Sequence, residues 1–245
     1  MDCSTTITKE HWLSKNIIEQ LYGDGLPPLV SGVPWLKGVE RPIGANSLAA
    51  PVLCERHNSG LSPLDAAAGG TFAALWDFQQ AQQDPHRMHV NDFAIVSGPH
   101  LERFLLKMLW GGCAAGSFGG GGAPVPDIRS DADHVRLLEA LYSGGELPDG
   151  WGMFSQAHPV DPHGPQHSVG INTLSGPDGT AWGLSVDVGA VRVSFALGVP
   201  GRGSIHRPGA IILDALGTAS EKVLAIAWPS DGHSTVTYTY GGQAS

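Results

Sequence analysis

The spacing of apolar residues changes near residue 150, and this change limits the chain to a mixed α and β fold. Before that point apolar side chains recur at intervals of three and four, which is typical of amphipathic helices. After it come short runs of β-branched and aromatic residues bounded by turns. The sequence therefore predicts an α+β protein: a helical N-terminal part followed by an antiparallel β-rich C-terminal domain.

Four helices are expected in the first part of the chain. The second has the clearest start, because Ser62 and Pro63 are typical of the first positions of a helix. The polar run 79–89 is expected to end that helix and form a loop. The four helices are expected at 12–21, from Ser62, from Pro99 and from about Ser130.

Three regions follow from these patterns: a first domain at 1–110, a Gly-rich linker and helix at 111–149, and the β domain at 150–245. The stretch 111–126 has no strand before it and no Gly-Lys-Ser/Thr after it, so it is predicted as a linker and not as a phosphate-binding loop. Hairpin turns are expected at 176–179 and 230–233. The expected strands are 48–53, 169–174, 181–188, 191–197, 222–228 and 235–240.

Composition excludes several classes of protein. No segment approaches the ~20 apolar residues of a membrane span, and the start of the chain lacks a basic and apolar leader, so a soluble, cytoplasmic protein without a membrane partner is expected. The net charge of −9 disfavours a broad basic face for nucleic acid but allows a local phosphate site. The 11 histidines make metal chemistry worth testing.

Two cysteines and a histidine suggest a structural zinc site. Cys54 and His57 stand at a Cys-x-x-His spacing, which suits one corner of a tetrahedral zinc site, and Cys3 is the candidate third ligand. Cys54 also follows an apolar strand, so burial of a free cysteine in the core is the alternative.

The run Thr8-Lys9-Glu10-His11 and the run Cys54-Glu55-Arg56-His57-Asn58 ahead of a helix together resemble the HNH endonuclease superfamily, over residues 1–80. The resemblance implies a ββα segment around a divalent metal, Mg²⁺ or Mn²⁺, with a structural zinc. It implies that His11 is the general base, that Glu10 holds the catalytic metal and that Asn58 fixes the His11 loop. It also assigns zinc to Cys54 and His57.

Where the family has a last histidine, Asp65 is the nearest candidate metal ligand. The first Cys-x-x-Cys of the family is missing apart from Cys3. Each candidate also has a simpler interpretation. Glu10 and His11 suit the N-terminus of the following helix, Asp65 suits a helix cap, and Asn58 suits a turn.

Three other groups of polar residues are weaker candidates for a site. One group, at 102–107, is expected to form a solvated helix face. A histidine-containing stretch at 158–167 is expected to be a surface loop, with an open metal site as its alternative. The remaining group is a candidate phosphate contact in a Gly/Pro-rich loop: Arg202, His206 and Arg207.

The leading function is metal-dependent phosphodiester hydrolysis of nucleic acid by an HNH-type nuclease, or nucleic-acid binding by a nuclease-derived protein. The first alternative is a non-catalytic, zinc-stabilised binding or interaction module. The second is a structural or assembly protein without a metal. The sequence leaves open whether the nucleic acid is DNA or RNA, which target sequence is recognised and what the oligomeric state is.

Overall fold

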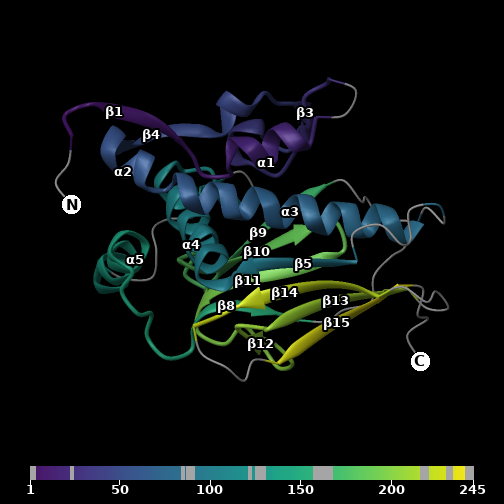
Figure 1. Cartoon of the computed structure of the whole chain (residues 1–245). Coiled ribbons are helices and arrows are strands. Elements are labelled where there is room, and N and C mark those ends of the chain that lie inside the picture. The colour runs from purple at the N-terminus through teal and green to yellow at the C-terminus, as the bar shows by residue number, and fades with distance from the viewer. Residues whose placement is uncertain are drawn as a thin grey trace.

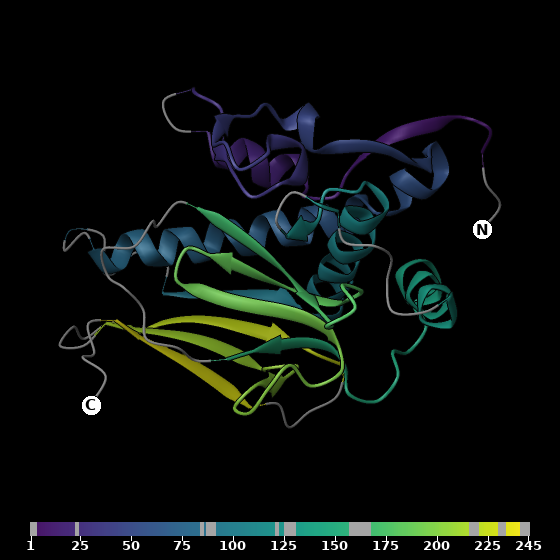
Figure 2. The same cartoon turned by 180° about the vertical axis from the view of Figure 1, so that it is seen from behind.

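The computed structural model describes residues 4–22, 25–83, 86, 92–120, 123–124, 131–156, 168–215, 221–229 and 234–240. Helices and strands are both abundant in these residues, so the mixed α and β class predicted from the sequence is confirmed. Figures 1 and 2 show three layers: an N-terminal segment, two long helices beneath it, and the β-rich region beneath the helices.

The N-terminal layer is built around a two-stranded antiparallel hairpin of β1 (Ile7–His11) and β4 (Ala49–Cys54). Between these strands lie a helix and several short elements, and after β4 the chain enters α2 (Glu55–Gly60). The expected strand at 48–53 is therefore present. The intervening elements are α1 (Lys15–Gln20), β2 (Leu29–Val30), η1 (Pro34–Leu36), β3 (Arg41–Pro42) and η2 (Ala45–Leu48).

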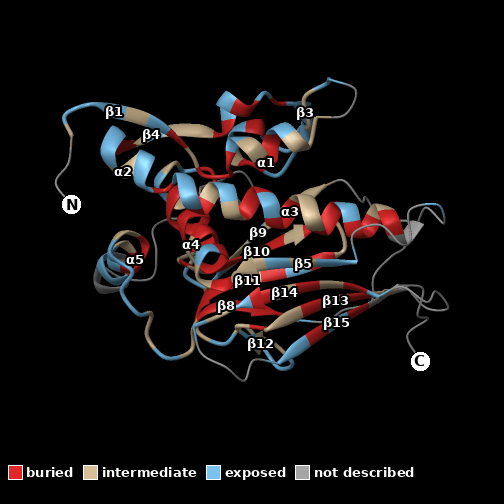
Figure 3. Ribbon diagram, in the orientation of Figure 1, coloured by how far each residue is buried: buried red, intermediate tan, exposed pale blue. Residues whose placement is uncertain are grey.

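The middle layer consists of α3 (Ser62–Gln83) and α4 (Gly98–Ala114), which pack against each other and against the sheets. Helix α4 is buried around most of its circumference, which is typical of a helix inside the core. Figure 3 shows this contrast, since α3 keeps an exposed stripe and α4 is largely buried. A further helix, α5 (Asp131–Ser143), lies where the sequence predicts it.

The C-terminal layer contains two sheets, where the sequence predicts one. A five-stranded antiparallel sheet has the order β12-β8-β11-β10-β9, and β9 and β10 form the expected hairpin around 176–179. Its strands are β8 (Trp151–Ser155), β9 (Val169–Ser175), β10 (Ala181–Val188), β11 (Val191–Leu197) and β12 (Ile205–His206). The predicted turn at 230–233 lies outside the described residues.

The second sheet is mixed, with the order β15-β13-β14-β5, and two of its three pairings are parallel. The expectation of a purely antiparallel C-terminal half was therefore wrong for this sheet. Its strands are β5 (Phe93–Ser97), β13 (Ala210–Ala215), β14 (Lys222–Ala227) and β15 (Thr235–Tyr240).

Strand β5 comes from the range predicted as the first domain, yet it pairs with β14 from the range predicted as the third. A single cluster of buried apolar side chains also extends from α1 through α3 and α4 into both sheets. The ranges 1–110 and 150–245 thus share a sheet and a hydrophobic core.

Two predicted helix ends were wrong. Helix α3 continues through the polar run to Gln83, because the buried Gln79 amide donates to the Val188 carbonyl at 2.9 Å and accepts from the Ala190 N–H at 2.8 Å. Helix α4 continues through Gly111 and Gly112 to Ala114, into the predicted linker. Glycine at 112 permits this because the Phe118 ring occupies the space that a Cβ would need.

Two very short strands, β6 (Gly119–Gly120) and β7 (Ala123–Pro124), lie in the rest of the predicted linker. Among the described residues, no helix combines the length and the apolar character needed to cross a bilayer.

Candidate functional site

The end of β1 places Glu10 and His11 in a pocket. The register of β1 against β4 shifts between Thr8 and Glu10, because two residues of β4, Pro51 and Val52, lie opposite the single residue Lys9 of β1. Such a bulge in β4 bends the strand pair and increases its twist at this point. Glu10 is buried and His11 half-buried, both on a strand, so the alternative that they open the next helix was wrong.

Asn58 fastens α2 to β1. Its Nδ2 donates to Thr8 Oγ1 at 2.9 Å and to the Lys9 carbonyl oxygen at 3.2 Å. Both acceptors lie on β1 beside the bulge, about 50 residues earlier in the chain, so Asn58 stabilises the backbone that carries Glu10 and His11. The structure thus brings together the residues to which the HNH resemblance assigns a base and a loop-fixing amide.

Asp65 lies in the first turn of α3, where its carboxylate binds a lysine from α4. Lys107 Nζ lies 2.6 Å from Asp65 Oδ1 and also contacts Glu10 Oε1. The Lys107 side chain is 1% exposed and that of Glu10 5%. We call Glu10, Asp65 and Lys107 the carboxylate–lysine cluster. It joins β1, α3 and α4 through one ammonium group.

The prediction of a solvated helix face at 102–107 was wrong, since Glu102 and Lys107 are both buried. The sequence does carry a signal for this. Lys107 interrupts a run of bulky apolar residues from Phe104 to Trp110, and a helix that is apolar around its whole surface belongs in the core. A lysine in such a helix requires a buried partner.

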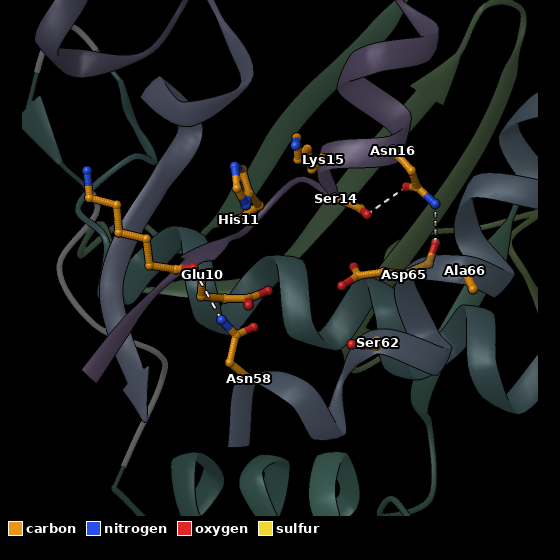
Figure 4. Close-up of a pocket in the computed structure, with 10 residues that line it drawn as sticks. Glu10, His11, Ser14, Lys15, Asn16, Asn58, Ser62, Asp65 and Ala66 are labelled. Atoms are coloured by element: carbon orange, nitrogen blue, oxygen red, sulfur yellow. Dashed lines mark hydrogen bonds between the residues drawn. The ribbon is translucent and has the colours of Figure 1, made fainter. Parts of the chain in front are cut away.

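The pocket in front of the cluster is a cavity of about 300 Å³. Figure 4 shows the carboxyl groups of Glu10 and Asp65 and the amide of Asn58 directed toward the same space, with His11 and Lys15 at its border. The Asn16 amide donates to the Asp65 carbonyl at 3.0 Å and holds α1 against α3. The lining residues are Lys9, Glu10, His11, Ser14, Lys15, Asn16, Asn58, Ser62, Asp65 and Ala66.

The environment favours the neutral form of His11. Burial lowers the pKa of His11, and the positive charges of Lys107 and Lys15 lower it further. Its Nε2 atom is buried without a hydrogen-bond partner among the described residues. Burial also raises the pKa of Glu10, although Lys107 opposes that effect. A neutral imidazole with an unpartnered nitrogen is able to accept a proton or a hydrogen bond from a ligand.

The two described residues of the predicted zinc site lie together. Cys54 Sγ is 3.0 Å from His57 Nδ1, and the Ser4 backbone N–H donates to the same sulfur at 3.4 Å. Hydrogen bonds from the His57 backbone, and then from Ser4, lower the pKa of the Cys54 thiol to about 6. The His57 ring packs edge-on against Tyr142. Cys3 lies outside the described residues.

The remaining candidates lie elsewhere. His158, His163 and His167 fall outside the described residues. Arg207, predicted to contact phosphate, instead forms a two-pronged ion pair with the buried Glu102, at 2.9 and 3.0 Å. His206 stacks on Phe154, and both His206 and Arg202 are exposed.

The cluster does not fit a divalent metal. A buried ammonium already contacts one oxygen of each carboxylate, and a divalent cation beside it would face that positive charge at close range. Within the described residues, no three His, Cys, Asp or Glu side chains are grouped to hold a metal ion.

Compared with known proteins, the chain matches no family model, no curated protein and no solved structure.

Proposed function

We propose that this pocket binds the phosphodiester backbone of nucleic acid, as a binding site derived from an HNH-type nuclease. The observation that carries the proposal is His11: an imidazole kept neutral by burial and nearby lysines, with a buried, unpartnered Nε2, on a strand end that Asn58 holds in place. The resemblance at residues 8–11 and 54–58 supports the same class of ligand.

The charges at the pocket border suit a phosphate. Lys9 and Lys15 both line the pocket and are exposed. Lys15 lies 3.4 Å from Glu19, but a pair this exposed is weak and leaves the ammonium available to a ligand. Because the whole chain has a net charge of −9, contact with nucleic acid is expected to be confined to this pocket.

The test is fluorescence anisotropy with labelled single-stranded and double-stranded DNA and RNA oligonucleotides over a range of salt. Lys9→Ala and Lys15→Ala should each weaken binding and reduce the salt dependence by about one phosphate contact. Lys37→Ala is the matched control, since Lys37 is exposed and not among the lining residues. Absence of binding, or equal weakening by the control, would contradict the proposal.

Hydrolysis is tested in parallel by plasmid nicking with Mg²⁺, Mn²⁺ or chelator. A binding site without a metal should bind the plasmid without nicking it. Nicking that requires a divalent metal and is lost in His11→Ala would instead support the nuclease that the sequence resemblance implies.

The contact between Cys54 and His57 favours a second candidate, a zinc-stabilised interaction module. Metal analysis of protein purified without chelator should then find about one zinc per chain, and chelation should lower the melting temperature because zinc binding is coupled to folding. Protein free of zinc would end this candidate and leave the pocket proposal unaffected.

A further inference from the structure

Lys107 is one of two buried lysines among the described residues, the other being Lys222. Lys107 lies on α4, a helix whose other inward residues are almost all apolar, and its side chain is 1% exposed. Moving an ammonium out of water carries a large desolvation penalty, so a buried ammonium requires close anionic partners. Two carboxylates from two other elements supply them.

The number of carboxylates exceeds what one ammonium requires. When both are ionised, Glu10 and Asp65 carry two negative charges against the single charge of Lys107. The Asn58 amide and the His11 imidazole line the same pocket. Carboxylate and amide oxygens are typical ligands of Mg²⁺ and Mn²⁺, so the donors around this lysine are those of a site for such a cation.

We propose that the Lys107 ammonium takes the place of a divalent cation between the two carboxylates that line this pocket. It neutralises one of the two negative charges and holds one oxygen of each carboxylate, so the natural protein binds no divalent metal there. Removing the ammonium leaves two unneutralised carboxylates, which match a divalent cation in charge. A site for Mg²⁺ or Mn²⁺ should therefore open when Lys107 is replaced by an uncharged residue.

This inference deepens the proposed function, because it implies that the pocket binds a phosphodiester without a metal. That consequence rests on the proposed function. Its test needs no nucleic acid. Mn²⁺ binding is measured by the electron paramagnetic resonance signal of free Mn²⁺ during titration of the full chain, Lys107→Met and Lys107→Met/Asp65→Asn.

Lys107→Met should bind about one Mn²⁺ per chain, at least tenfold more tightly than any Mn²⁺ binding by the natural protein at this pocket. The double variant should lose this site because only Glu10 then remains charged. Mn²⁺ should also raise the melting temperature of Lys107→Met and leave that of the natural protein unchanged, since a ligand that binds only the folded state stabilises it.

Two results would overturn the inference. One is a Mn²⁺ site in the natural protein that Asp65→Asn abolishes, and this measurement stands even if Lys107→Met fails to fold. The other is folded Lys107→Met without a gain in Mn²⁺ affinity. Failure of the proposed function looks different, since the oligonucleotides would then not bind the natural protein whatever the Mn²⁺ titrations show.

Discussion

Helix α4 carries two buried ionic groups five residues apart, and they are neutralised in different ways. Glu102 is matched by one partner: Arg207 donates to both carboxylate oxygens, and the Met153 N–H donates to Oε1 at 2.9 Å. Lys107 is shared between two carboxylates from β1 and α3. The first group is balanced in charge and joins α4 to the sheet, whereas the second has an excess negative charge and faces the pocket.

The comparison separates a buried charge that stabilises packing from one that belongs to a binding site. A charge-balanced pair whose hydrogen bonds are all made has a structural role, since it joins two elements. An unbalanced group beside a cavity, next to an imidazole with an unpartnered nitrogen, has capacity left for a ligand. The two clusters therefore make opposite predictions when one partner is removed.

The largest expected effect is the loss of Arg207. In Arg207→Met the carboxylate of Glu102 stays buried without its cation, which should lower the free energy of unfolding by about 3 kcal/mol. The measurement is urea denaturation followed by circular dichroism. The control is Arg192→Met, whose ion pair with Asp187 is more exposed and should contribute about 1 kcal/mol or less. Equal losses in both variants would contradict the role given to Glu102.

The carboxylate–lysine cluster should tolerate the loss of one partner and not of both. Glu10→Gln and Asp65→Asn should each cost about 1 kcal/mol or less, because the other carboxylate still neutralises Lys107. The double variant leaves a buried ammonium unpaired and should cost about 3 kcal/mol. Denaturation of the three variants and the natural protein gives the coupling free energy between Glu10 and Asp65 directly. Additive losses would show that Lys107 is not shared.

The sequence predicts local elements better than contacts between distant segments, for a physical reason. Strands β10 and β11 have the predicted bounds because alternation and turn residues are local signals. The parallel pairing of β5 with β14 joins segments about 130 residues apart, and no local pattern records it. Likewise, the partners of Glu102 and Lys107 lie on other elements, so helix periodicity alone suggested a solvated face.

The proximity of the four motif residues was predicted better than the pairing of the strands, because motif spacing keeps its meaning without knowledge of the packing. Glu10, His11, Asn58 and Asp65 do line one pocket. What the motif could not predict is Lys107, which comes from a helix beyond the resemblance. The apolar run around Lys107 indicates that this lysine is buried and needs an anionic partner. It does not indicate which residue that partner is.

A smaller effect is expected for Asn58, which holds the strand end beside the cluster. Asn58→Ala removes two hydrogen bonds to β1, opposite the bulge in β4, and should lower the free energy of unfolding by about 1 kcal/mol. Ser59→Ala, an exposed change in the same helix, is the control and should be close to neutral. Oligonucleotide affinity should fall in Asn58→Ala and not in Ser59→Ala, because only Asn58 positions His11.

His11 gives the pocket a pH signature. Its pKa is lowered in the folded state, so its contribution to stability is present above the unfolded value of about 6.5 and is lost as the pH falls through the folded value. The melting temperature of the natural protein should therefore fall more on acidification below pH ~6.5 than that of His11→Asn. Parallel curves for the two proteins would show that burial does not disfavour the charged imidazole.

The smallest expected effect concerns Cys54, at the far end of the same hairpin. Because backbone hydrogen bonds from His57 and Ser4 favour the thiolate, its ultraviolet absorbance should titrate near pH 6 in chelator-treated protein, and Cys54→Ser should remove that transition. His57→Phe keeps the backbone and the ring packing against Tyr142 but loses Nδ1. The transition should then move only part of the way toward the ordinary thiol pKa of about 8.5, since the largest cause of the shift remains. A full return to that pKa would show that the His57 imidazole, and not the backbone, stabilises the Cys54 thiolate. Cys54 and His57 would then form a charge pair like that of Glu102 and Arg207.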